Sequence, residues 1–543
     1  MLLSNLDLLA TASGGVARLR ELILTLAVQG NLVPQDPADE PAGVLLQKIR
    51  AEKDRLIAEG KIKRDKPLAE IAEEEKPFER MPQGWEWASL ATIGVINPRN
   101  DAPDETLASF VQMSSIPVEF SAAHVSEPRP WKDIKSGFTQ FAEGDVGVAK
   151  ITPCFENGKS TVFQNLSNGI GAGTTELHIV RPLGGIERRY VLLFLKTPAF
   201  LKDGEAVMTG SAGQKRLPRS YFEGKPFPLP PLPEQSRIVT RVEELMRLCD
   251  ALEAKGRLEA AQHAQLVSTL LGTLTASTTP EELAENWQRV AQHFDLLAGR
   301  PAAIDALEQT LLQLAVRGLL VPQDPTDEPA SALLQKIRTE KDRLIATGQI
   351  KRDKPLPPIT DKEKPFELPV GWEWARLNDL IRISSGDGLT AAQMAPGGTV
   401  PVYGGNGVNG HHDLANVEEP TLVIGRVGYY CGSVHVTPTR AWVTDNAFIT
   451  RYPKAYLDMN WLYWLLVGTN LKENDSATAQ PVISGRKLYP IVVALPPLPE
   501  QSRIVTRVTA LRRLCADLRQ RLADAQTSQS HLAQALVDST SSV

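Results

Sequence analysis

Several segments of this chain have the residue types and spacing of known catalytic sites, and each lacks a part that the chemistry needs. Gly405, Gly407 and Gly410 form a GxGxxG pattern, which binds dinucleotide phosphates where a helix follows at once. A loop and a strand-like segment follow here instead. The GKS triplet at 158–160 has Pro153 where a phosphate-binding loop has its first glycine. We therefore expect a tight glycine loop and no nucleotide site.

Metal chemistry has similarly weak support. His411, His412, Cys431 and His435 carry the right donor atoms, but their spacing matches no standard zinc pattern. Adjacent histidines also do not normally converge on one tetrahedral site. We expect no metal in this chain.

Nuclease and methyltransferase motifs are also incomplete. Pro103–Asp104 and the DIK triplet at 133–135 only weakly resemble a nuclease motif of the form PD…(D/E)xK, and the second half of the chain has no counterpart. The Asn/Asp/Ser-Pro-Pro-aromatic motif of amino-methyltransferases is absent, since the paired prolines of this chain follow leucine, and so is GxSxG. The sequence therefore predicts that the chain is not an enzyme.

The segments that would position a functional site occur twice in the chain. LPPLPEQSRIVTRV at 229–242 recurs at 495–508, and LVPQDPADEP at 32–41 recurs as LVPQDPTDEP at 320–329. LLQKIR, EKDRLIA, IKRDKPL, KPFE and GWEWA follow the second motif in both halves. A duplicated unit of this kind predicts a pseudo-twofold internal repeat.

Two inserts interrupt this repeated frame, and they differ from each other. Residues 89–228 and 376–494 share almost no sequence, and the first is about 20 residues longer. Both read as mixed α/β segments with short strands, and each has one apolar helical pattern, at 188–201 and 459–471. We expect the inserts to share a fold and to recognise different things, because the frame is kept while the inserts diverge.

Each insert leads into a long helix with heptad spacing. The predicted apolar seams are Ile238, Val242, Leu245, Cys249, Leu252, Leu266 and Leu270, and Ile504, Val508, Leu511, Cys515, Leu518, Leu522, Ala525, Gln529, Leu532 and Leu536. Under the pseudo-twofold, the two helices should pack antiparallel, and the N-terminal helix at 16–28 should sit after the C-terminal one in space, so that the two termini meet. Such a pair could act as a ruler between two domains or as a plain structural bundle.

Composition limits the compartment and the mode of binding. The net charge is -5, and the inserts carry 15 basic and 14 acidic residues and 9 of each, so any nucleic-acid binding must use local patches or a partner's charge. Four scattered cysteines without a CxxC motif indicate a reducing compartment. No signal peptide or membrane-length apolar run is evident. The sequence predicts a cytoplasmic protein that contacts no membrane.

The repeated motifs resemble those of a known family. LAVQG followed by LVPQDP, PFE followed by GWEW, and LPPLPEQSRIV at the start of a helix are similar to the DNA-specificity subunit of type I restriction–modification systems. Segments such as 144–160 and VIGRVGYYCG at 423–432 resemble the target recognition domains of that family. The resemblance covers nearly the whole chain.

Family membership implies an α+β protein. Two target recognition domains of mixed α/β fold would be joined by long helices that form an antiparallel coiled coil. The predicted boundaries are an N-terminal helical region at 1–83, recognition domains at 84–232 and 370–498, a central region at 233–369 and a C-terminal helix at 499–543. The alternatives are a duplicated structural scaffold and a solitary DNA-modifying enzyme.

The resemblance also implies partners. Each recognition domain would read half of a bipartite, asymmetric site on double-stranded DNA, and the helices would dock two modification subunits and, through them, two restriction subunits. The implied cofactors lie in those partners: S-adenosylmethionine in the modification subunit, and ATP and Mg in the restriction subunit. This chain would carry no cofactor and no catalytic residue.

Candidate DNA-binding residues are polar side chains near glycines, where the backbone can approach a DNA groove. Arg and Lys suit guanine, and Asn and Gln suit adenine. A solvated loop is the alternative for any single residue. The candidates are Lys150, Thr152, Glu156, Asn157, Lys159, Gln214, Lys215 and Arg216 in the first insert, and Tyr403, Asn406, Asn409, His411, Arg426 and Gln480 in the second.

Overall fold

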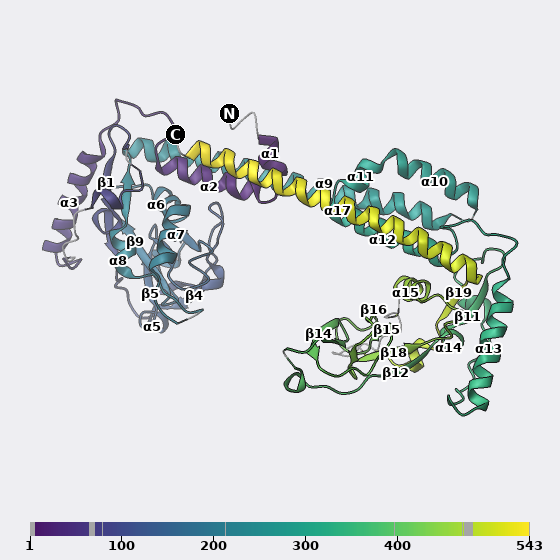
Figure 1. Cartoon of the computed structure of the whole chain (residues 1–543). Coiled ribbons are helices and arrows are strands. Elements are labelled where there is room, and N and C mark those ends of the chain that lie inside the picture. The colour runs from purple at the N-terminus through teal and green to yellow at the C-terminus, as the bar shows by residue number, and fades with distance from the viewer. Residues whose placement is uncertain are drawn as a thin grey trace. The chain divides into compact units, whose positions relative to one another are not determined.

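The structure is a computed structural model, and it describes residues 6–64, 71–78, 80–211, 213–277, 279–395, 397–469, 471 and 482–541. The chain forms two compact units (Figure 1). Unit 1 consists of Met1–Glu259 and Gln526–Val543, and unit 2 consists of Ala260–Ala525. Each unit therefore holds one insert and one copy of the repeated frame. Among the described residues, no helix is both long and apolar enough to cross a bilayer.

The frame helices occur in equivalent sets. Unit 1 has α1 (Leu6–Thr11), α2 (Gly15–Val28), α3 (Ala42–Ala58) and η2 (Glu73–Glu75). Unit 2 has α11 (Phe294–Ala298), α12 (Pro301–Val316), α13 (Ala330–Ala346) and η5 (Asp361–Glu363). Gly30 and Gly318 follow α2 and α12 with φ values of 76° and 72°, a left-handed conformation that favours glycine at a helix end. The two glycines therefore end equivalent helices in the two units.

The repeat begins earlier than the sequence analysis recognised. α1 contains LDLLA and α11 contains FDLLA, and Leu9 and Leu297 occupy equivalent buried positions in the two units. Five residues are too few to stand out without the structure. The helix α10 (Pro280–Gln292), which precedes α11, has no counterpart among the described residues.

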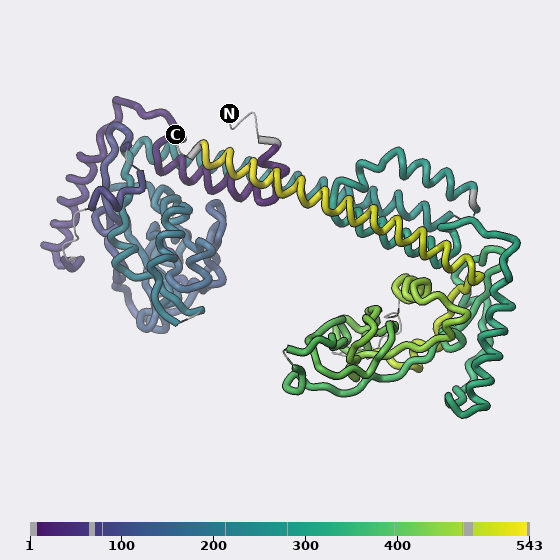
Figure 2. Tube along the Cα trace, viewed as in Figure 1, coloured from purple at the N-terminus to yellow at the C-terminus, as the bar shows by residue number. Residues whose placement is uncertain are grey.

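The two long helices, α9 (Leu232–Ala276) and α17 (Leu498–Ser541), each contribute to both units. Each unit contains the N-terminal part of one and the C-terminal part of the other, as an antiparallel pair requires. In unit 1, Leu9 and Leu22 pack with Ala533 and Val537 near the end of α17. Figure 2 shows α2 beside the yellow end of α17, so the predicted neighbourhood of N-terminal and C-terminal helices is confirmed.

The predicted apolar seam is wrong in the C-terminal part of each long helix. Leu266 and Leu532 are 57% and 60% exposed, whereas the next residues, Val267 and Ala533, are buried. The buried face therefore shifts by one residue in both copies. A straight α-helix has 3.6 residues per turn and drifts by about 20° per heptad against a strict seven-residue repeat, which accounts for the shift.

The first insert is built from two four-stranded sheets, and β1 and β10 pair separately as a two-stranded antiparallel sheet. One has the antiparallel order β2-β9-β6-β7, and the other has the order β4-β3-β8-β5 with β3 and β8 parallel. The strands are β1 (Glu86–Ser89), β2 (Gly94–Ile96), β3 (Leu107–Val111), β4 (Glu127–Pro130), β5 (Thr139–Ala142), β6 (Val146–Ala149), β7 (Ser160–Val162), β8 (Ile170–Gly173), β9 (Leu177–Pro182) and β10 (Pro226–Leu229). The short helices are α4 (Leu90–Ile93), η3 (Met113–Ser115), α5 (Trp131–Ile134), η4 (Ser167–Gly169) and α8 (Arg219–Gly224).

The second insert repeats this plan. Its antiparallel sheet has the order β12-β18-β15-β16, and its second sheet, β14-β13-β17, has β13 and β17 parallel. The elements are β11 (Glu373–Arg376), α14 (Leu377–Leu380), β12 (Arg382–Ser385), η6 (Ala391–Gln393), β13 (Val400–Gly404), β14 (Gly407–His412), β15 (Leu422–Gly425), β16 (Val434–Val436), β17 (Trp442–Val443), β18 (Ala447–Arg451), α16 (Gly485–Leu488) and β19 (Val492–Leu495). The inserts share a fold, as predicted, although they share almost no sequence.

The two apolar helical patterns differ in detail from the prediction. The segment at 459–471 contains a single helix, α15 (Met459–Gly468). The segment at 188–201 instead contains α6 (Arg188–Leu195) and the start of α7 (Pro198–Val207). Thr197 divides them because its hydroxyl caps the backbone amide of Phe200 at 3.3 Å and Pro198 favours a helix start.

An ion pair joins α2 to α9 in unit 1, and its counterpart in unit 2 has the opposite polarity. Arg20 of α2 contacts Glu253 of α9 at 2.6 Å. At the equivalent positions of unit 2, Glu308 of α12 pairs with Arg519 of α17, and Arg512 binds the same carboxylate. Burial alone would raise the pKa of Glu308, but hydrogen bonds from the two arginines outweigh it and the pKa lies below its ordinary value.

The reversed polarity predicts that α2 pairs specifically with α9 and that α12 pairs specifically with α17. Arg20→Glu should place three carboxylates together, since Asp250 also contacts Arg20 at 2.6 Å, and should lower the stability of unit 1 by about 1–2 kcal/mol. Glu308→Arg should cost unit 2 about 3 kcal/mol, because Glu308 is nearly buried between two arginines. Hydrogen–deuterium exchange of the full chain, read separately over α2 and α12, measures both effects.

The pH dependence supplies a control. Since the pKa of Glu308 is lowered on folding, its contribution is present above the unfolded-state pKa and is lost as the pH falls through the folded one. Glu308→Gln should therefore flatten the acid sensitivity of exchange over α12 and leave α2 unchanged. Equal sensitivity over α12 in wild type and variant would contradict the role of this pair.

Candidate nucleic-acid interface

A buried glutamate holds the start of the first insert to the long helix. Glu234 of α9 is 1% exposed. Its carboxylate accepts hydrogen bonds from Trp85 Nε1 at 2.9 Å and from Gln35 Nε2 at 3.2 Å. The three residues belong to LPPLPEQ, GWEW and VPQDP, so one contact explains why three separate motifs are kept. Burial raises the pKa of Glu234, and these hydrogen bonds partly offset that rise.

Unit 2 contains the same contact. Glu500 accepts hydrogen bonds from Trp372 Nε1 at 3.1 Å and from Gln323 Nε2 at 3.2 Å, and burial again raises its pKa. The two tryptophans of each GWEW motif occupy different environments. Trp372 is buried beside the carboxylate, whereas Trp374 is half-exposed and lies against Phe366 with ring centroids 4.9 Å apart.

The neighbouring glutamine orients each insert. Gln235 donates to the carbonyl of Pro230 at 2.9 Å and accepts from the amide of Glu187, the residue before α6, at 3.0 Å. The equivalent contacts in unit 2 join Gln501 to Pro496 at 3.3 Å and the amide of Asp458, before α15, to Gln501 at 2.9 Å. The LPPLPEQ motif thus fixes both the entry strand and the main helix of an insert.

This frame brings two loops of the first insert together. The loop after β6 runs beside residues 213–217: the amide of Thr152 donates to Lys215 O at 3.1 Å, and the amide of Lys215 donates to Thr152 Oγ1 at 3.1 Å. The amide of Leu217 donates to Lys150 O at 2.7 Å. Lys150, Thr152 and Lys215, which the sequence analysis selected from distant segments, are therefore neighbours.

Arg216 and Gln214 lie on the same loop. The guanidinium group of Arg216 binds both carboxylate oxygens of Glu176, at 2.8 and 3.0 Å, on the exposed surface. Its hydrogen bond lowers the pKa of Glu176. Gln214 is exposed beside Gly213, whose φ of 78° places it in a tight turn. Gln214 thus remains solvent-facing, whereas Arg216 would bind a new partner only by sharing or leaving Glu176.

The remaining candidates of the first insert lie on the far side of the β6–β7 loop. Glu156 and Asn157 are exposed in its turn. Lys159 is half-buried, and its ammonium group donates to Met113 O at 2.9 Å. Lys159 therefore stabilises the insert internally, whereas Glu156 and Asn157 face solvent.

The second insert has an equivalent loop pair. Arg426 is the counterpart of Lys150. Val148 pairs with Ser160 and Ile424 pairs with Val434 at the equivalent strand ends, and Lys150 and Arg426 each follow two residues later. The amide of Ile483 donates to Arg426 O at 2.9 Å, as Leu217 does to Lys150. The guanidinium of Arg426 donates to Ser385 Oγ and Asp445 O, each at 3.3 Å, and lies 5.4 Å from the ring centre of Phe448. Gln480 lies outside the described residues.

A glycine hairpin lies against this loop. Of the GxGxxG glycines, Gly405 lies in the turn between β13 and β14, Gly407 begins β14, and Gly410 lies within β14 opposite Val402; no helix follows at once, as expected. A Cβ at Gly405 would lie 2.8 Å from Val427 O, and Ser433 Oγ donates to Gly405 O at 2.7 Å. Glycine is therefore required for the close approach of the two loops. Asn406 is exposed at the hairpin tip beside them.

The other candidates of the second insert are spread along the hairpin. Asn409 and His411 are exposed on β14. The amide group of Asn409 occupies the space where a Cβ of Gly404 would stand. Tyr403 is half-buried and its hydroxyl donates to Val436 O at 3.4 Å. Asn406 and Arg426 thus lie at the loop pair, whereas Tyr403 belongs to the packing beneath it.

Two tyrosines at the loop tip were missed by the sequence analysis. Tyr429 and Tyr430 are 81% and 49% exposed, with ring centroids 5.1 Å apart in an edge-to-face pair. Gly428 and Gly432, with φ values of 90° and 82°, flank them. Adjacent aromatic residues between glycines could have been recognised in the sequence as exposed rings, because side chains on a tight turn rarely reach the core. Exposed aromatic rings suit stacking on nucleic-acid bases.

The residues whose spacing suggested metal or nuclease chemistry lie in ordinary structural environments. Cys431 is buried, His411 is exposed, and His435 Nε2 lies 3.2 Å from Ser433 Oγ. No group of three metal-ligating side chains converges within the described ranges. Asp104 pairs with Lys135 at 2.5 Å on the surface. These side chains are accounted for by packing and surface pairing.

Comparison with known proteins defines the class. A family model described as "Type I restriction modification DNA specificity domain" matches residues 369–525. The chain is 44% identical to the EcoAI specificity subunit of Escherichia coli, across 96% of this chain and 93% of that protein. It is also 44% identical to the EcoEI specificity subunit of Escherichia coli over the same shares. A solved chain from a study of type I R-M assembly matches the fold with a TM-score of 0.51 at 18% identity, covering 85% of this chain and 99% of that one.

The repeated frame and paired inserts thus define a DNA-specificity protein. The chain belongs to the specificity subunits of type I restriction–modification systems. It is a specificity subunit rather than an enzyme, and the resemblance seen in its sequence is confirmed. The predicted α+β fold class is confirmed as well.

Proposed function

We propose that each insert reads one half of a bipartite, asymmetric site on double-stranded DNA. The observation that carries this proposal is the pair of equivalent loops with different side chains. The first insert presents Lys150, Thr152 and Lys215 there, and the second presents Arg426 with Tyr429 and Tyr430. Two half-sites of different sequence require a repeated frame that carries loops with different side chains.

Substitutions at these loops should act on one half-site each. Lys150→Ala with Lys215→Ala should weaken binding about tenfold and reduce the salt dependence by about two counterions, because lysine side chains release condensed ions from phosphates. Tyr429→Ala with Tyr430→Ala should weaken binding about tenfold through lost base stacking, with the salt dependence unchanged. The measurement is fluorescence anisotropy with the assembled methyltransferase complex, on DNA altered in either half.

Matched controls lie elsewhere on the same inserts. Lys132 pairs with Glu105 at 2.9 Å, and Arg440 pairs with Glu418 at 3.3 Å, both on the surface. Lys132→Ala and Arg440→Ala remove the same kind of charge and should leave affinity nearly unchanged. Loss of affinity in the controls equal to that in the loop variants would argue against these loops as the contact.

We further propose that the long helices dock two modification subunits, and through them two restriction subunits. Exposed leucines support this. Leu248 and Leu514 are 59% and 58% exposed at equivalent positions of α9 and α17, and Leu266 and Leu532 form a second equivalent pair. Solvent-facing leucines kept in both copies fit a partner that binds twice. In this proposal S-adenosylmethionine belongs to the modification subunit, ATP and Mg belong to the restriction subunit, and the complex acts in the cytoplasm.

Charge introduced at these leucines should remove partners one at a time. Leu248→Asp or Leu514→Asp should each leave one bound modification subunit, and the double variant should leave none, because a buried unpaired carboxylate opposes docking. Native mass spectrometry of the complex counts the subunits. Leu258→Asp is the control, since Leu258 is equally exposed but its counterpart in α17 is Asp524. Loss of a subunit in this control would contradict the proposed surface.

A further inference from the structure

The two copies of the frame differ at a buried position where the entry strand meets the end of the insert. Ser89 in β1 lies opposite Pro226, and Arg376 in β11 lies opposite Val492, so the strand register makes Ser89 and Arg376 equivalent. Both residues are buried, at 4% and 5% exposure. A long cation in one copy is therefore replaced by a short hydroxyl in the other.

Arg376 occupies a fully formed guanidinium site in unit 2. Its Nε donates to Pro357 O at 3.1 Å, its Nη1 to Pro490 O at 2.6 Å and its Nη2 to Pro358 O at 3.4 Å. Nη1 also lies 3.0 Å from the carboxylate of Glu363, the last residue of η5. Carbonyls and a carboxylate around a planar cation are the partners that a guanidinium group prefers.

Unit 1 keeps part of this site without the arginine. Glu75, the last residue of η2, is the counterpart of Glu363, and Gly224 is the counterpart of Pro490. The counterparts of the two proline carbonyls at 357 and 358 lie outside the described residues. Ser89 does not reach toward Glu75, because its hydroxyl is hydrogen-bonded to Thr92 Oγ1 at 2.9 Å and accepts from the amide of Thr92 at 3.2 Å.

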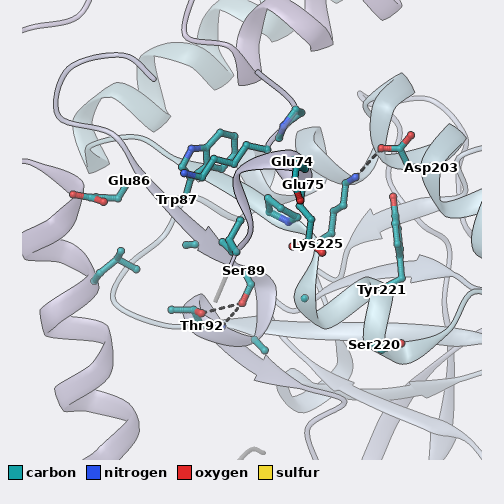
Figure 3. A pocket seen from close by; sticks show the side chains of 18 of the residues that line it. Glu74, Glu75, Glu86, Trp87, Ser89, Thr92, Asp203, Ser220, Tyr221 and Lys225 are labelled. Atoms are coloured by element: carbon teal, nitrogen blue, oxygen red, sulfur yellow. Dashed lines mark hydrogen bonds and ion pairs between the residues drawn. The ribbon is translucent and has the colours of Figure 1, made fainter. Parts of the chain in front are cut away.

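An open groove lies where the arginine would extend. It has a volume of about 1170 Å³, and its lining includes Glu75, Ser89 and Gly224. Figure 3 shows Glu74 and Glu75 in the middle of the lining, between Trp87 and the Lys225–Asp203 pair, with Ser89 and Thr92 below them in the view. Trp87 and Tyr221 also line it; Lys225 Nζ already lies 5.5 Å from the ring centre of Tyr221, whereas Trp87 offers an aromatic surface of the kind on which guanidinium groups stack.

The lining of the groove includes four acidic side chains, Glu74, Glu75, Glu86 and Asp203. Four basic side chains line it, but three of them have acceptors of their own: Lys225 pairs with Asp203 at 2.7 Å, Lys53 donates to Ala91 O at 2.5 Å, and Lys76 pairs with Glu73. The remaining charged side chains of the lining are Arg50, Glu74, Glu75 and Glu86. The lining is therefore balanced in charge overall, and Glu74 and Glu75 provide its carboxylates near the position where Glu363 meets Arg376 in unit 2.

We propose that this groove in unit 1 binds a guanidinium group supplied from outside the chain, with Glu75 as its carboxylate partner. The second copy of the same frame supplies its own guanidinium from Arg376 and makes the corresponding contacts. The site is independent of DNA reading by the inserts.

The test uses the full chain and ethylguanidinium at millimolar concentration. Wild type should bind it saturably, and about tenfold more tightly than ethylammonium at equal ionic strength, because planar donors reach several acceptors at once. Saturation-transfer NMR measures both affinities. Ser89→Arg should abolish binding by filling the site, and Glu75→Gln should weaken it about tenfold. Equal binding of the two cations, or binding unchanged in both variants, would overturn the proposal.

Unit 2 provides an internal control, because rescue of a variant by an added guanidinium compound distinguishes loss of the site from general misfolding. Arg376→Ser should destabilise unit 2, and ethylguanidinium should restore its hydrogen-exchange protection while ethylammonium does not. A failure of this rescue would overturn the chemical equivalence on which the proposal rests. A further arm separates the sources: weaker assembly of Ser89→Arg with its partner subunits identifies a protein arginine as the occupant, and unchanged assembly identifies a free guanidinium compound.

Discussion

Exchanging residues 89–228 for the insert of another specificity subunit should change one half of the methylated DNA motif and leave the other half intact. The exchange keeps the contact between Glu234 and Trp85, and it leaves Gln235 in place to accept from the backbone amide before the main helix of the new insert. We expect the sequence of that half-site to change entirely, because the loops that carry Lys150 and Lys215 are replaced together. Sequencing of N6-methyladenine in cells that express the chimera with its modification subunit measures the change.

The reciprocal exchange is the control. Replacing residues 376–494 removes the loops of Arg426 and the two tyrosines and should alter the other half of the motif. A change in both halves after either exchange would contradict modular reading.

Glu500→Ala should be among the most destabilising single substitutions in unit 2, at about 3 kcal/mol. The change leaves Trp372 Nε1 buried without its acceptor and removes one acceptor from Gln323. Hydrogen exchange should rise throughout unit 2 and remain unchanged in unit 1. Glu234→Ala should have the converse effect. Glu244→Ala, which removes a surface pair with Arg241 at 3.0 Å, should change stability by less than about 0.5 kcal/mol.

The pH dependence of this anchor has a definite sign. Burial raises the pKa of Glu500 above its ordinary value of 4.5, so the folded unit binds the proton more tightly than the unfolded chain. The carboxyl therefore stabilises unit 2 most below pH 4.5, and this contribution declines as the pH rises through the folded pKa. Glu500→Gln lacks it, so the advantage of wild type over this variant should grow as the pH falls. A constant difference would contradict the raised pKa.

The repeated frame was predictable from sequence because its motifs are identical in both copies. The reason for their identity was not, since the glutamate of LPPLPEQ, the tryptophan of GWEW and the glutamine of VPQDP are far apart in the chain and meet only in space. The heptad pattern predicted two long helices correctly but misplaced Leu266 and Leu532, because a strict seven-residue count ignores the drift of a straight helix. The match between α1 and α11 was too short to recognise.

The candidate site was predicted in part. Glycines and polar residues marked the loops that carry Lys150, Thr152, Lys215 and Arg426, and the fold places three of these together within the first insert. Side-chain direction was not predictable, so Lys159 and Tyr403 were chosen although both bond within the insert. Tyr429 and Tyr430 were missed because residue-by-residue base readout favours polar side chains and overlooks stacking.

The most direct test of the central claim is a map of methylated adenines in cells that express this chain with its modification subunit. Two inserts that each read one half-site predict a single motif made of two specific halves separated by a gap of unspecified sequence. The modification subunit without this chain should leave no such motif, and the purified chain alone should transfer no methyl group. A continuous motif with no gap, or the same motif in cells that lack this chain, would contradict the account.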